Sequence, residues 1–128
     1  MATIADYVFD AALAKFDTEA NRIDVCSSEP TTYTAATTTP ASSGVSLGNA
    51  TSISISAPAD RTGGGRKVTV SAITNGSVTY SATATHYAIV DTVNSRLLAT
   101  GSLSASQSVT SGNTFTLTAF DVGIPDPA

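Results

Sequence analysis

Alternation of apolar and hydroxyl residues constrains this chain more than any other feature of its sequence. Between residues 51 and 120, several short apolar runs are interrupted at every second position by serine or threonine, as at Val68 and Val70. Successive side chains of an extended strand point to opposite faces, so each run presents one apolar and one hydroxylated face. The sequence therefore predicts a β core over residues 51–120.

Turn sequences separate these runs at intervals of about 8 to 12 residues. Asn75-Gly76 is the strongest hairpin signal, because both central positions of a type I′ turn need positive φ. Asn94-Ser95 and Ser111-Gly112-Asn113 predict two further turns. About seven or eight short strands joined in this way predict a mainly β fold, an antiparallel β-sandwich or barrel-like domain.

Residues 3–18 carry the only convincing helical pattern. Thr3 is a possible N-cap, and Asp6 favours the positive end of the helix. Apolar residues recur at spacings of four, which predicts one buried face. That face packs either on the sheet of its own subunit or on a neighbouring subunit. The predicted stripe consists of Val8, Ala12 and Phe16, with Phe9 and Leu13 beside it.

The length of 128 residues suits one domain with its own core. Residues 21–27 predict a short strand with Arg22, Asp24 and Cys26 on one face. Residues 29–50 are nearly all Thr, Ala, Ser, Gly and Pro, and predict an Ω-loop on the parent domain, an arm on a neighbour, or a disordered segment. The predicted organisation is a single domain (1–128) with a helix (3–18), a long loop or arm (29–50), a β core (51–120) and a C-terminal tail (121–128).

Charge and hydropathy exclude several classes of partner. The net charge is −4, and the six basic residues are spread along the chain, so we expect no nucleic-acid partner. We also expect no membrane segment and no secretory signal peptide, because the chain lacks both a long apolar run and a cationic N-terminal region. The lone Cys26 cannot form an internal disulfide, which fits synthesis in a reducing cytoplasm.

Few residues in this sequence suit catalysis or metal binding. His86 is the only imidazole and lies in a strand pattern, whereas Cys26 is expected to be a buried small apolar residue. One histidine and one cysteine do not make a structural zinc site. Asp6, Asp10 and Asp17 predict a solvated acidic helix face. We therefore predict no enzyme activity and no catalytic, cofactor-binding or metal-binding residue.

The glycine-rich segment Thr62–Lys67 invites comparison with phosphate-binding loops. Its spacing does not match the known fingerprint, and a strand pattern follows it where a helix would be required. We interpret it as a mobile loop.

Five segments carry a resemblance that covers nearly the whole chain, from the helix to the last strand. Together they resemble small virion proteins of tailed bacteriophages. The resemblance implies a structural protein present in many copies, and it implies no functional residues. The segments are Arg22–Thr34, Gly65–Ile73, His86–Asp91, Arg96–Gly101 and Thr114–Asp121.

The expected function is that of a capsid decoration (cement) protein located in the virion. Such a homo-oligomer would brace the major capsid protein, or other virion subunits, through many modest interfaces. We expect contacts at the helix, at residues 29–50 and at the tail from Asp121. A neck, collar, tail or fibre-attachment protein is the alternative. A glycan-binding β-sandwich module is a second alternative, although the chain has no Trp and only 6% aromatic residues for stacking on sugars.

Overall fold

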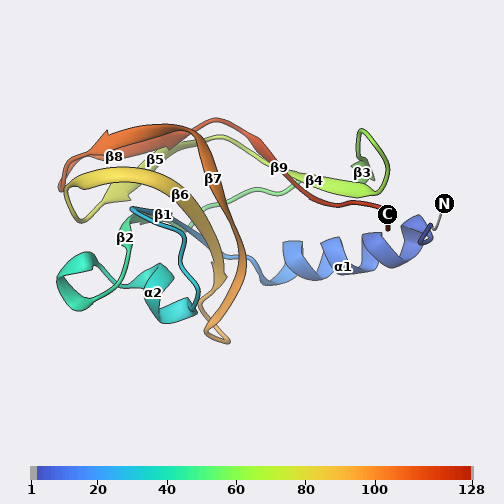
Figure 1. Cartoon of the computed structure of the whole chain (residues 1–128), viewed down its shortest axis with the longest axis horizontal. Helices are drawn as coiled ribbons and strands as arrows, with labels where there is room; N and C mark the ends of the chain where they lie inside the picture. Colours follow the sequence, from blue (N-terminus) through green and yellow to red (C-terminus); the bar gives the residue numbers. More distant parts are fainter. Residues whose placement is uncertain (1–2, 128) are drawn as a thin grey trace. The chain divides into compact units, whose positions relative to one another are not determined.

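A computed structural model describes residues 3–127 of the chain (Figure 1). It confirms the predicted mainly β fold, with 46% strand, antiparallel sheets and one N-terminal helix. The described residues group into two compact units, a division that the prediction of one domain did not anticipate. Unit 1 comes from Met1–Glu19, Ser54–Ala72 and Thr118–Ala128, and unit 2 from Ala20–Ile53 and Ile73–Leu117.

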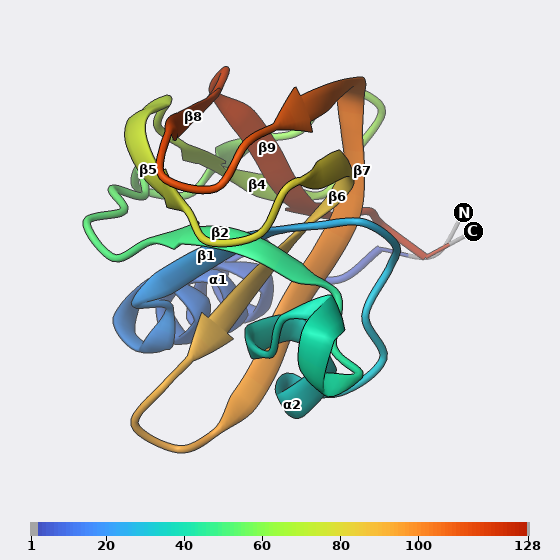
Figure 2. The same ribbon diagram turned by 90° about the vertical axis from the view of Figure 1, so that its left-hand side faces the viewer.

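Unit 2 is built on a six-stranded sheet in the order β7-β6-β1-β2-β5-β8. All of its neighbouring strands run antiparallel. Figure 2 shows the long strands β6 and β7 side by side. The strands are β1 (Arg22–Cys26), β2 (Ser46–Ala50), β5 (Ile73–Val78), β6 (Ala82–Asp91), β7 (Arg96–Val109) and β8 (Thr114–Leu117).

The central strand β1 is buried on both faces. The predicted strand at 21–27 is thus confirmed, and its alternation places Ile23 and Val25 on one face and Asp24 and Cys26 on the other. The second face lies beneath a small cluster that includes Ala36 of a short helix, α2 (Tyr33–Thr37). Burial of both faces makes β1 the part of unit 2 where a polar side chain most needs a partner.

The prediction of a long loop or arm at residues 29–50 is wrong. This segment contains α2, a single 3₁₀ turn, η1 (Pro40–Ser42), and β2. Thr32 caps α2 by accepting a hydrogen bond from the Ala35 amide at 3.1 Å, and the Val45 amide donates to the Ala35 carbonyl at 2.9 Å. The segment is folded onto its own unit, because its small side chains let the backbone approach β1 closely.

The predicted hairpin turn at Asn75-Gly76 is also wrong. Both residues lie inside β5, and the positive-φ glycines of the described chain are Gly63, Gly64, Gly65 and Gly112. A Cβ on Gly76 would lie 2.2 Å from Cζ of Phe115 on β8. Glycine is therefore required here for close approach of an aromatic ring, at an irregularity in the β5–β8 register.

The other two predicted turns are confirmed. Ser95, with φ of 55°, lies in the turn between β6 and β7, and Gly112, with φ of 91°, lies between β7 and β8. Both residues occupy the left-handed region that a tight reversal needs.

The side chain of Asp91 accepts hydrogen bonds within the β6–β7 turn. We predict that the free energy of unfolding that these bonds contribute is lost at acidic pH. The carboxylate is 2% exposed and accepts hydrogen bonds from the Asn94 side chain at 2.7 Å and from the Val93 amide at 2.9 Å. These bonds, that of Asn94 above all, hold the pKa of Asp91 below its ordinary value. A lowered folded-state pKa stabilises the fold above the unfolded-state pKa, and the benefit is lost as pH falls through the folded-state pKa.

Asp91→Asn is accordingly expected to unfold at lower urea concentration than the wild type at pH 7. The difference between the two proteins should shrink as pH falls below about 4, since the unfolded wild type is protonated first and the folded carboxylate only at lower pH. Asp17→Asn, which changes an exposed carboxylate of the N-terminal helix, is the matched control. A difference that persists unchanged at pH 2.5 would contradict the assignment.

Unit 1 consists of the helix α1 (Asp6–Glu19) and a three-stranded sheet in the order β3-β4-β9. Its strands are β3 (Ala59–Asp60), β4 (Arg66–Val70) and β9 (Phe120–Ile124). The prediction of a C-terminal tail over 121–128 is therefore wrong for its first half, which pairs antiparallel with β4. The strand ends just before Pro125, which has no amide hydrogen for the ladder.

Candidate interaction surface

The buried face of α1 differs from the predicted one. The helix begins at Asp6 rather than at Thr3, and it buries Phe9 and Leu13, which are 5% and 2% exposed. Val8 and Ala12 of the predicted stripe are exposed instead. Phe9 and Leu13 share the spacing of four but are larger than Val8 and Ala12, so burying them removes more apolar area from water.

Arg66 on β4 fixes the orientation of α1 within unit 1. Its guanidinium forms a bidentate ion pair with Asp10, with Nε 2.8 Å from Oδ1 and Nη2 3.2 Å from Oδ2. Nη1 lies 2.6 Å from Asp60 Oδ1, and these carboxylates raise the pKa of Arg66. The helix side that carries Asp10 is thereby held toward β4. Of the carboxylates predicted to form a solvated acidic face, Asp10 is paired with Arg66, whereas Asp17 is exposed to solvent.

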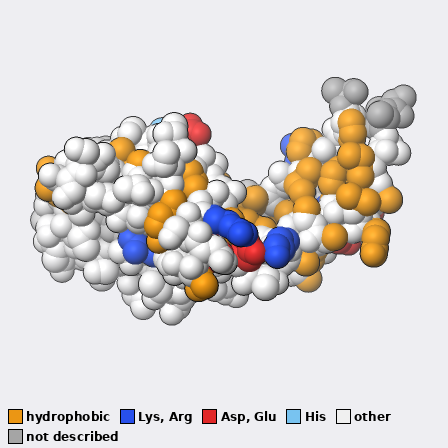
Figure 3. Space-filling model, turned by 90° about the horizontal axis from the view of Figure 1, so that it is seen from below, with side chains coloured by type: hydrophobic (Ala, Val, Ile, Leu, Met, Phe, Trp, Pro, Cys, Tyr) orange, Lys and Arg blue, Asp and Glu red, His pale blue; other side chains and the backbone are white. Residues whose placement is uncertain are grey.

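The opposite side of α1 is apolar and exposed. Tyr7 is 83% exposed and Val8 53%, and Ile4, just before the helix, is 39% exposed. Within the helix, Tyr7, Val8, Ala11, Lys15 and Thr18 recur at spacings of three and four and form one stripe, and Ile4 precedes it in the sequence. We call these six residues the outward stripe. Figure 3 shows hydrophobic side chains gathered over this part of unit 1.

Apolar residues thus occur on two opposite sides of α1, as they do in helices that are buried on both sides. Within unit 1 only one of these sides is buried. The exposed side is therefore a candidate interaction surface.

A second ion pair of unit 1 joins β4 to β9. Lys67 Nζ lies 2.7 Å from Asp121 Oδ2, which also keeps the pKa of Asp121 low. Both residues line a shallow depression of about 340 Å³, together with Arg61, Thr62 and Gly123. Asp121 neutralises Lys67 there, and Arg61 donates to the Gly64 carbonyl at 3.1 Å. The predicted glycine loop lies beside the depression as a turn of three positive-φ glycines followed by β4.

The lone thiol and the lone imidazole of the chain lie on neighbouring strands. Cys26 on β1 is the register partner of His86 on β6. Burial, and secondarily Asp24, raises the pKa of the Cys26 thiol to about 12. A catalytic thiol needs a lowered pKa, so this one remains a protonated, buried group, as the sequence predicted. His86 contacts the hydroxyls of Thr85 at 2.9 Å and Ser102 at 3.4 Å.

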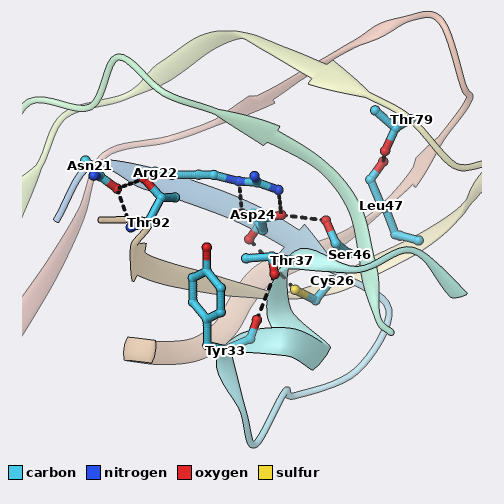
Figure 4. Close-up of polar contacts among 10 residues, drawn as sticks. All are labelled: Asn21, Arg22, Asp24, Cys26, Tyr33, Thr37, Ser46, Leu47, Thr79 and Thr92. Carbon is cyan, nitrogen blue, oxygen red and sulfur yellow. Dashed lines mark hydrogen bonds and ion pairs between the residues drawn. The ribbon is translucent and has the colours of Figure 1, made fainter. Parts of the chain in front are cut away.

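A buried polar group that sequence analysis missed joins β1 to β2 (Figure 4). Asp24 is fully buried, and Arg22 donates to both of its oxygens, from Nε at 2.7 Å and from Nη2 at 2.8 Å. Ser46 Oγ donates to Asp24 Oδ2 at 2.6 Å. Burial raises the pKa of Asp24, and the bond to Asp24 raises that of Arg22. The spacing of Arg22 and Asp24 by two on a strand is the sequence signal that could have found this pair.

Every part of this buried group has a partner, so we interpret it as structural. No buried side-chain nitrogen or oxygen in the described chain lacks a hydrogen bond.

Residues 3–127 also contain no cluster of three His, Cys, Asp or Glu side chains that could hold a metal ion. Across the same residues, neither the length nor the hydropathy of any helix suffices to cross a membrane.

Comparison of the chain with protein-family models, with curated proteins and with solved structures finds no match. Any statement of function therefore rests on the chain's own residues.

Proposed function

We propose that this chain is a non-enzymatic structural protein of a phage particle, and specifically a capsid decoration protein. The observation that carries the proposal is the outward stripe of α1, an exposed apolar surface on a helix whose opposite side is already packed. The partner class is the major capsid protein or other subunits of the virion, together with further copies of the chain. The phage particle enters the proposal only from the expectation drawn from the sequence, and the exposed stripe enters it from the structure.

The charge arrangement favours assembly over binding of a charged ligand. Most of the cations are paired with carboxylates of the same chain, as in Lys15–Glu19 at 3.0 Å, Arg22–Asp24 and Arg66–Asp10. The rest of the surface is rich in serine and threonine, which cost less to desolvate than ions. Interface cores are depleted of charged residues, so a surface with few unpaired ions suits repeated weak contacts.

Co-sedimentation with purified particles tests the proposal. Capsids that lack the protein, and separately tails, are mixed with increasing amounts of the chain and pelleted. Saturable binding to capsids at a fixed ratio is the expected result. Binding to tails alone would shift the assignment to a neck, tail or fibre-attachment protein, and binding to neither would overturn the proposal.

A further inference from the structure

We propose that the depression on unit 1 binds a hydroxylated carboxylate of the uronic acid class. In this assignment Arg61 holds the carboxylate of the ligand, and Asp121 accepts a hydrogen bond from a neighbouring hydroxyl group. The inference goes beyond the proposed function and does not depend on it. It assigns a small-molecule site to a surface that the decoration role leaves unused.

The depression lies on the face of the three-stranded sheet that is turned away from α1. The guanidinium of Arg66 on β4 pairs with α1, and successive side chains of a strand point to opposite faces, so Lys67 lies on the other face. The register of β4 and β9 pairs Lys67 with Gly123 and Thr69 with Asp121, which brings these residues to the same face. The volume of about 340 Å³ is within the range of small-molecule sites.

Arg61 is the exception to the pairing of cations with carboxylates in this chain. Four of the other cations lie within ion-pair distance of a carboxylate, whereas within residues 3–127 no ion pair joins Arg61 to one. Its partly buried guanidinium donates from Nη1 to the Gly64 carbonyl at 3.1 Å. A guanidinium has five N–H donors, so most of them remain available for a ligand. Arginine binds carboxylates more strongly than neutral acceptors.

The turn between β3 and β4 positions Arg61 at the depression. The Arg61 amide donates to the Gly65 carbonyl at 3.1 Å, and the Gly64 amide donates to the Arg61 carbonyl at 3.1 Å. Residues 63–65 have φ between 89° and 102°, the left-handed region that glycine adopts at little cost. A Cβ on Gly123 would lie 3.0 Å from Arg61 Cδ, so the arginine side chain runs along β9 only because residue 123 is glycine.

The carboxylates around the depression restrict the ligand to a single negative charge. Among the lining residues, Arg61 and Lys67 against Asp121 leave one net positive charge. Asp126 lies just beyond them, with Oδ2 3.0 Å from the position that a Cβ on Gly64 would occupy. A dianion such as phosphate would be repelled by both carboxylates, whereas a carboxylate ligand carries the one charge that Arg61 can neutralise.

The polar groups beside Arg61 favour hydroxyl groups on the ligand. The Asp121 side chain is 47% exposed and accepts from Lys67 Nζ and from Thr69 Oγ1, one on each oxygen and both at 2.7 Å. Each oxygen keeps a lone pair for a further donor, and the hydroxyl of the exposed Thr62 can donate or accept. A carboxylate on a ring with several hydroxyl groups, as in a uronic acid, matches this set of donors and acceptors.

Titration of the isotope-labelled chain with glucuronate, followed by amide NMR, tests the site. We expect saturable shifts of the amide signals of residues 63–65 and of Gly123, with a dissociation constant on the order of 1–10 mM. Glucose has the same ring without a carboxylate, and acetate has a carboxylate without hydroxyl groups. Each should bind at least about tenfold more weakly than glucuronate.

Two outcomes of this titration would overturn the proposal. Acetate bound as tightly as glucuronate would indicate a site for any carboxylate, such as an acidic side chain of another protein. Glucuronate that leaves these glycine amides unshifted would show that the depression does not take this class of ligand.

Two variants decide whether Arg61 holds the carboxylate. Arg61→Gln removes the charge and is expected to weaken glucuronate binding at least about tenfold. Gly123→Ala keeps the charge but displaces the side chain, and should weaken binding by at least about threefold. Lys15→Gln, which removes an ion-paired cation of α1, is the control for net charge and should match the wild type. Wild-type affinity in both Arg61→Gln and Gly123→Ala would overturn the assignment.

Discussion

Arg22→Met is expected to lower the free energy of unfolding by about 3–5 kcal/mol, the cost of removing one partner of a buried ion pair. Asp24 is fully buried on β1, and Arg22 supplies two of its three side-chain hydrogen bonds. Without Arg22 the carboxylate keeps only the Ser46 hydroxyl as a side-chain donor. The measurement is urea denaturation followed by circular dichroism, with Lys15→Met as the control for loss of an exposed ion pair, expected to cost less than about 0.5 kcal/mol.

The pH dependence separates an unpaired charge from a packing defect. Burial already raises the pKa of Asp24, and loss of Arg22 raises it further, so the folded variant takes up a proton before the unfolded chain does. A raised folded-state pKa means that stability is lost as pH rises through it. The deficit of Arg22→Met should therefore shrink between pH 7 and pH 5.

A triple variant gives the matching control for this buried group. Arg22→Met, Asp24→Leu and Ser46→Ala together remove all three polar side chains, and their combined cost should be far below that of Arg22→Met alone. A pH-independent deficit, or a triple variant as unstable as the single one, would contradict the account.

The strand pattern was predictable because alternation reports burial directly. Val68 and Val70 of β4 are buried between more exposed neighbours, as their period of two requires. The alternation of β1 predicted its two faces equally well. Nothing in that pattern indicated which segment of the chain covers the second face. That cover is α2, a five-residue helix too short to show a helical period of its own.

The candidate surface could be located on a helix but not on a particular face of it. Apolar residues occur on both sides of α1, so the sequence pattern alone offers more than one stripe. Burial of the larger Phe9 and Leu13 is accompanied by the pairing of Asp10 with Arg66, 56 residues away in the sequence. Contacts between distant segments of this kind leave no local signal.

Gly76 shows how one local signal can have two physical causes. Asn-Gly is common in turns because glycine tolerates positive φ, but glycine is also selected where another group comes too close for a Cβ. At this position the second cause applies, since Phe115 of β8 covers the Cα. Only knowledge of the β5–β8 register distinguishes the two.

Gly76→Ala is therefore expected to destabilise the protein by about 3 kcal/mol, as overpacking does in a filled core. The new Cβ would lie 2.2 Å from Cζ and 2.3 Å from Cε1 of Phe115, a ring that is only 2% exposed. The ring cannot move away without displacing its neighbours. Denaturant midpoints at constant slope measure the loss.

Two further variants decide whether the aromatic ring is the cause. Gly123→Ala on β9 is the control, because its Cβ would meet chiefly the flexible Arg61 side chain at 3.0 Å, and a change below about 1 kcal/mol is expected. Phe115→Leu removes the part of the ring that the new Cβ would strike. If the contact is responsible, Gly76→Ala costs at least about 1 kcal/mol less in the Phe115→Leu background than in the wild type. Strictly additive losses would instead assign to Gly76 a backbone role, as a turn would require.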